Sequence, residues 1–100
     1  MPTVYVPHKP DDTYQFSAAQ KFGTIKILFE GRQNVVNAPG LPELVDDMMS
    51  NFGPDDYILV GGNRMILLLA FRSALRRNGK VKVLVYGSRS EAYKEQEIKA

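Results

Sequence analysis

A strand–helix–strand pattern in the second half of the chain constrains the fold more than any other feature. Residues 57–60 form a compact apolar run, residues 64–77 have the length of a helix, and residues 80–86 place valines at alternate positions. Asn63 is a good N-terminal cap for this helix, and an Asn-Gly pair after Arg77 is a good end for it. Two strands joined by a helix within about 30 residues are typical of a βαβ unit. We therefore expect two parallel strands and a helix whose first half, apolar almost all round, is deeply buried.

The first half of the chain predicts two further strands. Residues 3–6 are β-branched and aromatic, and Pro7 ends them, which favours an edge strand because proline cannot donate to a sheet ladder. Residues 24–30 alternate between two faces, as a half-buried strand does. Between these strands, residues 17–22 fit a helical turn with Ser17 as its cap.

A second helix is predicted to begin at Pro42 and to end before Gly53, after a long irregular connection over residues 31–40. The apolar residues of this helix recur at helical spacing and predict one buried stripe, formed by Leu44, Val45, Met48, Met49 and Phe52. In the tail, residues 93–98 show no helical stripe, which favours an antiparallel edge strand over a frayed helix.

These elements predict an α/β fold in a single domain spanning residues 1–100. We expect a mixed sheet of four to five strands with two helices packed on it, containing the C-terminal βαβ unit. The order of the strands does not follow from the sequence.

Charge and composition exclude several classes of protein. The chain has 13 basic and 11 acidic residues, and this net charge of +2 is too even to indicate a nucleic-acid binder as a whole. It has no cysteine and one histidine, which excludes disulfide scaffolds, thiolate zinc sites, thiol catalysis and multi-histidine metal sites. The longest apolar run, residues 65–71, is far shorter than the roughly 20 residues that cross a bilayer. Since no basic and apolar signal segment opens the chain, we expect a cytoplasmic protein with no metal and no cofactor.

Two stretches of the second half, DYILVGGN at 56–63 and LRRNGKVKVLVY at 75–86, carry a resemblance to a known family. They resemble small proteins without assigned function from tailed bacteriophages, particularly marine and cyanobacterial ones. In the phage proteins, an Asp-Tyr-apolar-Gly strand end is followed by a helix, a Gly-Lys-Val-Lys strand and a terminal aromatic residue. The resemblance covers about residues 56–93. It implies a viral origin, a small accessory role and a place in the host cytoplasm, and it transfers no catalytic residue.

The turn between the predicted strand and helix is a candidate anion-binding site. It consists of Gly61, Gly62, Asn63 and Arg64 at the carboxyl end of a parallel strand, where ligands bind in α/β sheets. Free amides at a helix N-terminus can hold a phosphate or a carboxylate, and Arg64 would add charge. The alternative is a tight turn with an Asn cap, because neither dinucleotide-binding nor P-loop glycine spacing is present.

A basic cluster is the second candidate site. Residues 72–89 hold six basic residues and no acidic one, namely Arg72, Arg76, Arg77, Lys80, Lys82 and Arg89. Such a face could bind nucleic-acid phosphates or an acidic protein surface, with Tyr86 and Tyr93 stacking on bases. The alternative is a solvated helix end, where the macrodipole favours cations in any case.

Other polar residues give weaker signals. His8, Asp11 and Asp12 make a poor metal site, and His8 is interpreted as an exposed loop residue. The acidic pairs at 46–47 and 55–56 are interpreted as solvated surface.

These observations rank three functions. The first is a small non-enzymatic phage-type accessory protein that acts as a protein-interaction module, since no nucleophile–base pair is identifiable. The second is a nucleic-acid-binding module using the basic face from Arg72 to Arg89, and the third is phosphate or nucleotide binding at Gly61–Asn63. Partners would be a host or phage protein, or nucleic acid, and no membrane. Unpaired sheet edges also favour a homodimer.

Overall fold

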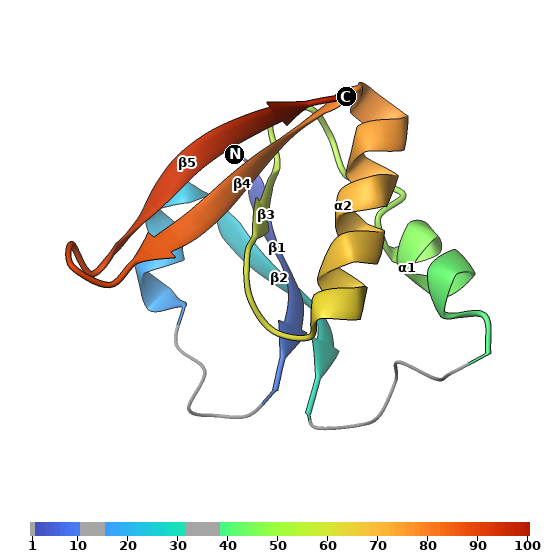
Figure 1. Cartoon of the computed structure of the whole chain (residues 1–100), viewed down its shortest axis with the longest axis horizontal. Helices are drawn as coiled ribbons and strands as arrows, with labels where there is room; N and C mark the ends of the chain where they lie inside the picture. Colours follow the sequence, from blue (N-terminus) through green and yellow to red (C-terminus); the bar gives the residue numbers. More distant parts are fainter. Residues whose placement is uncertain (1, 11–15, 32–38) are drawn as a thin grey trace.

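The computed structural model describes residues 2–10, 16–31 and 39–100. Within them, five strands form one mixed sheet, with the helices α1 and α2 on one face and the 3₁₀ helix η1 on the other (Figure 1). In chain order the elements are β1 (Thr3–Lys9), η1 (Ser17–Phe22), β2 (Thr24–Glu30), α1 (Leu41–Met48), β3 (Tyr57–Leu59), α2 (Arg64–Asn78), β4 (Lys80–Gly87) and β5 (Ala92–Lys99).

The strand order is β2-β1-β3-β4-β5. The first four strands are mutually parallel, and β5 runs antiparallel to β4 at the edge. The predicted fold class is confirmed, including the βαβ unit made of β3, α2 and β4. The tail is a strand, as its lack of a helical stripe predicts.

The prediction of an edge strand ending at Pro7 is wrong. Strand β1 continues to Lys9 and lies inside the sheet, between β2 and β3. Its pairing with β3 covers only Val4 and Tyr5. The amide of Thr3 donates to Asp56, just before β3. Pro7 lies beyond the end of the β3 pairing, and the register with β2 passes from Val6 to His8 without it, so β1 can lie inside the sheet despite the missing N–H group of Pro7.

Both faces of the sheet are buried, because successive side chains of a strand point to opposite faces. On the helix face, Tyr5 and Ile58 pack against Met49 and Leu69. On the η1 face, Val4, Leu59 and Leu84 pack with Ala19 and Tyr93. This two-sided burial explains the nearly continuous apolar run of β3.

The helix ends agree with the sequence analysis for α2 more closely than for α1. Asn63 Oδ1 accepts hydrogen bonds from the amides of Met65 and Ile66, and Gly79 ends α2 with a φ of 72°. By contrast, α1 begins at Leu41 and already ends at Met48. The inclusion of Leu44 in its buried stripe is wrong, because α1 packs with Leu41 and Val45 toward the core, and this leaves Leu44 exposed. For η1, the predicted turn forms, but Ser17 does not cap it.

Candidate functional site

The most distinctive surface feature is an apolar groove of about 470 Å³ between α2 and the β4–β5 hairpin. We call it the hairpin groove. Three elements and the end of β3 contribute to it. Its lining consists of Val60, Leu67, Leu68, Phe71, Val83, Val85, Gln96, Glu97 and Ile98.

The groove forms because β4 extends beyond the cover of α2. The valines of β4 alternate with residues of the other face, so Val81, Val83 and Val85 all point to the helix side. Val81 and Val83 are buried under α2, whereas Val85 is 41% exposed. On β5, Ile98 lies opposite Val81 and shares its face. The hairpin therefore presents an apolar floor that the chain covers only in part.

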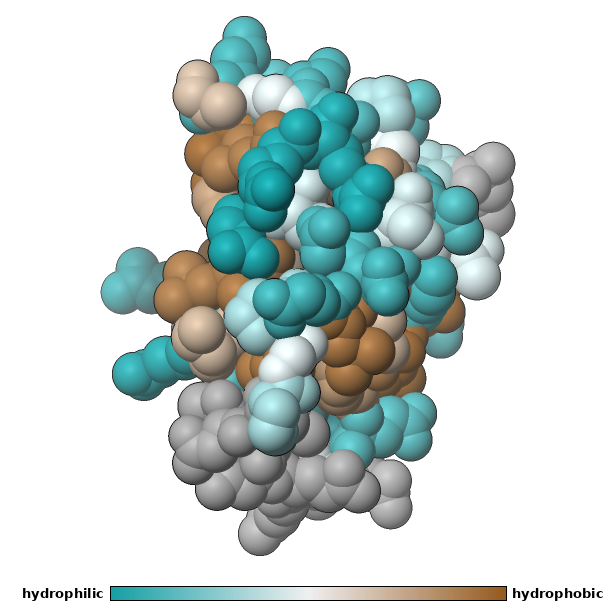
Figure 2. Space-filling model, turned by 90° about the vertical axis from the view of Figure 1, so that its right-hand side faces the viewer, coloured by the Kyte–Doolittle hydropathy of each residue, from teal (hydrophilic) through white to brown (hydrophobic). Residues whose placement is uncertain are grey.

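Exposed apolar side chains are concentrated at this groove. Seven large hydrophobic residues are exposed in the described part of the chain, and four of them line the groove, namely Val60, Leu68, Val85 and Ile98. Leu68 has the largest exposed fraction, 62%. Figure 2, which views the molecule from the side of α1 and α2, shows hydrophobic surface along its left-hand margin. Because Leu68 is exposed, the prediction that the first half of α2 is deeply buried is wrong on the side of this helix that faces the groove. Grouped exposure of this kind is typical of a binding surface.

Two cations flank the groove. Arg64 is exposed and lies one turn before Leu68 on α2, and Lys94 lies opposite Val85 on β5. Within the described residues, neither cation forms an ion pair. The acidic residue that lines the groove, Glu97, pairs with Lys80 at 3.6 Å. The uncompensated charge beside the groove is therefore positive.

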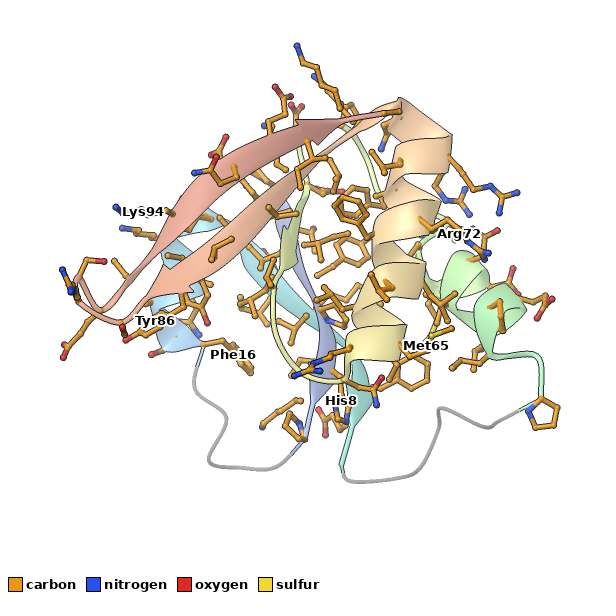
Figure 3. All side chains as sticks on the ribbon, viewed as in Figure 1. His8, Phe16, Met65, Arg72, Tyr86 and Lys94 are labelled. Atoms are coloured by element: carbon orange, nitrogen blue, oxygen red, sulfur yellow. The ribbon has the colours of Figure 1, made fainter. Side chains whose placement is uncertain are left out.

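A second hollow, of about 440 Å³, lies on the other face of the hairpin and is lined by Phe16, Ser17, Ala18, Val60, Tyr86, Glu91 and Tyr93. Tyr93 is buried, and its ring contacts that of Tyr86 edge to face, with 5.2 Å between centroids. Of the two tyrosines predicted to stack on bases, Tyr86 alone is exposed (Figure 3).

The six predicted basic residues do not share one face. Arg72, Arg76 and Arg77 lie on α2, and Figure 3 shows Arg72 on the side of α1, away from the hairpin. Lys80 and Lys82 alternate with Val81 and Val83 on β4, so they point to the opposite face of the sheet. Arg89 lies in the turn between β4 and β5.

Three of these cations already have partners. The guanidinium of Arg77 lies 3.6 Å from Asp46, and Lys82 lies 3.8 Å from Asp55 and over the ring of Tyr57. Lys80 pairs with Glu97. The Ser73 hydroxyl donates to Asp46, and this hydrogen bond, with the attraction to Arg77 adding to it, lowers the pKa of the Asp46 carboxyl.

The candidate anion site holds internal hydrogen bonds. The amides of Met65 and Ile66 donate to Asn63, and the amide of Asn63 donates to Nδ1 of His8 at 3.0 Å. Gly62 has a φ of 78°, and a Cβ there would collide with the carbonyl oxygen of His8. The turn is thus packed against β1. Its hydrogen bonds are those of a tight turn with an Asn63 cap, the alternative to an anion site.

His8 is a buried strand residue, so its interpretation as an exposed loop residue is wrong. It is 7% exposed and lies near the end of β1. Because Nδ1 accepts from Asn63, the proton is on Nε2, which donates to the carbonyl of Gly31 at 2.7 Å. The ring therefore ties together β1, the end of β2 and the start of α2.

One member of each acidic pair, at 46–47 and 55–56, accepts hydrogen bonds from other residues of the chain. Asp56 accepts from the amides of Thr3 and Gly53, and Asp46 accepts from Ser73. Asp11, Asp12 and residues 32–38 lie outside the described part of the chain. Within the described part, no group of His and carboxylates could hold a metal ion.

Sequence reasoning did not find the hairpin groove. Two signals for it are present: residues 65–71 are apolar on all sides of a helix, and the valine alternation of β4 continues to Val85. Both signals indicate more apolar surface than two helices and five strands can cover.

Comparison with known proteins places the chain in a phage family. Residues 2–100 match the family described as Phage Pam3 gp32-like protein. The chain belongs to this family. The membership confirms the resemblance to small phage proteins and extends it over almost the whole chain. No curated protein and no solved structure gives a significant match. No helix in the described ranges is long and apolar enough to cross a membrane.

Proposed function

We propose that this phage protein is a small non-enzymatic accessory protein that binds a partner protein through the hairpin groove. The observation that carries the proposal is the grouping of exposed Val60, Leu68, Val85 and Ile98 in one concave surface. Leaving such side chains in water costs on the order of 1 kcal/mol each or more, and a partner that covers them recovers this free energy. The occupant would be a helical segment of a host or phage protein, placed beside α2.

The distribution of basic residues favours a protein partner over nucleic acid. Three of the six cations have intramolecular carboxylate partners, and the set is divided between both faces of the sheet. A duplex contacts phosphates along one continuous face. The nucleic-acid function stays a prediction, which fluorescence anisotropy with labelled duplex DNA tests at low and moderate salt. Tight binding that weakens steeply with salt would favour nucleic acid over the groove.

A displayed library of helix-forming peptides, selected on the immobilised full-length protein, tests the groove. Selected peptides are expected to bind Leu68→Lys at least about tenfold more weakly than the native chain, because the ammonium group would be buried beneath them. Leu44→Lys is the matched control, since Leu44 is an exposed leucine on α1, outside the groove. Peptides that tolerate Leu68→Lys as well as Leu44→Lys would overturn the proposal, and so would a library that yields no binder.

A further inference from the structure

The groove's geometry and charge together specify its occupant. We infer that the hairpin groove binds an acidic amphipathic helix of a partner protein, lying beside α2 over β4 and β5. This inference rests on the proposed function and adds the chemical class of the partner.

The space on the sheet fits a helix. Strands are spaced by about 4.8 Å and a helix with its side chains is about 10 to 12 Å wide, so one helix covers about two strands. The two helices on this face therefore cover about four of the five strands. Burial agrees with this limit on β5, where Ile98 is 40% exposed, and Val85 shows that the end of β4 is also uncovered. A third helix beside α2 completes the layer that an α/β sheet needs.

The lining sets the apolar pattern of that helix. Leu68 and Phe71 lie on one wall, and Val85 and Ile98 belong to the hairpin on the other side. A helix between them needs a stripe of apolar residues at positions i, i+3, i+4 and i+7, as in other helix-in-groove complexes. Its remaining surface stays in contact with water and with the flanks of the groove.

The flanks set the charge of the helix. Arg64 lies beside the groove on the α2 side and Lys94 on the hairpin side, and no carboxylate of the described residues pairs with either. Of the arginines of α2, Arg64 is the one beside the groove, whereas Arg72 lies on the side of α1 and Arg77 pairs with Asp46. Glutamate or aspartate residues beside the apolar stripe would complement Arg64 and Lys94 and leave the docked surface without like-charge contacts.

The same charges disfavour a second copy of this chain as the occupant. Packing α2 of a second copy into the groove would bring another Arg64 to a surface that already carries Arg64 and Lys94, at a cost in electrostatic free energy. The acidic helix α1 already has its apolar residues Leu41 and Val45 in the core of its own chain. Neither α1 nor α2 therefore supplies a free apolar stripe with acidic flanks.

Two synthetic peptides of about 18 residues test the inference, a length at which a helix can persist when bound. Both carry the same leucine stripe, and their polar positions are glutamate in one and lysine in the other. Their affinities are measured by fluorescence anisotropy against the full-length protein and against Arg64→Glu/Lys94→Glu. The glutamate peptide is expected to bind the native protein at least about tenfold more tightly than the lysine peptide at low salt, with a smaller ratio at high salt. The double variant is expected to reverse this preference.

The control is Lys21→Glu/Arg76→Glu, which changes the net charge by the same amount at two exposed positions away from the groove, one on η1 and one about two turns beyond Leu68 on α2. It should leave the preference for the glutamate peptide largely intact. If both peptides bind equally and Leu68→Lys abolishes both, the acidic partner is excluded while the groove function stands. If neither peptide binds, the groove function falls and the inference falls with it. Equal effects of the two double variants would assign the preference to net charge, which also overturns the inference.

Discussion

The two flanks of α2 differ in how completely the chain covers them. Toward α1, the helix is closed by packing and by polar contacts, in which Ser73 donates to Asp46 and Arg77 donates to the Asp46 carbonyl. Toward the hairpin, Leu67, Leu68 and Phe71 line an open groove. The difference lies in the neighbours, because α1 packs against one flank, whereas no helix of the described chain packs beside the other, where the groove separates α2 from the hairpin.

Adjacent leucines express this contrast most simply. Leu69 is 5% exposed and Leu68 is 62% exposed, although they are consecutive residues of one helix with the same helix propensity. A pair of alanine substitutions here separates burial from every local property of the residue.

Leu69→Ala is expected to have the largest effect. Leu69 packs in the core on the helix face with Ile58 and Met49, and its removal leaves a cavity there. The expected loss in the free energy of unfolding is about 2 to 5 kcal/mol. Urea denaturation followed by circular dichroism measures it. A loss below about 1 kcal/mol would show that the closed flank is less tightly packed than the structure describes.

Asn63→Ala is expected to have an intermediate effect. Its side chain accepts from the amides of Met65 and Ile66, and alanine leaves both amides without this partner. Loss of such a cap costs about 1 kcal/mol. Denaturation of Asn63→Ala and Asn63→Asp measures this contribution, because aspartate keeps the accepting oxygen. If the aspartate variant were as unstable as the alanine variant, the capping interpretation would not hold.

The capped turn also shows which parts of the fold local sequence can predict. The strands 57–60 and 80–86, the Asn63 cap and the glycine end of α2 depend on spacing within a few residues, and all of them are present in the structure. The position of β1 in the sheet depends instead on which strand pairs with which. Its proline predicts an edge, and the short pairing with β3 removes that constraint.

The candidate sites show the same division. The sequence of β4 shows that Lys80 and Lys82 point away from Val81 and Val83. Because α2 packs on the face of the two valines, these lysines are separated from the arginines of α2. The burial of His8 does not follow in this way. It depends on Gly31 and Asn63, which are 23 and 55 residues away in the chain. The hairpin groove likewise joins residues of α2 and β5, and only the tertiary arrangement shows that no third helix of the described residues lies over them.

Leu68→Ala is expected to have the smallest effect on stability, and a small effect would show that Leu68 is exposed in solution. Most of the Leu68 side chain is already in water, and alanine is at least as good a helix former, so the free energy of unfolding should change by less than about 0.5 kcal/mol. The same denaturation experiment as for Leu69→Ala checks it, under identical conditions. A loss comparable to that of Leu69→Ala would mean that the flank toward the hairpin is closed in solution, either by the chain itself or by a second copy. Repeating the measurement over a range of protein concentrations separates these two cases, because only association makes the stability depend on concentration. A near-zero change at every concentration leaves Leu68 exposed in the isolated protein and available to a partner.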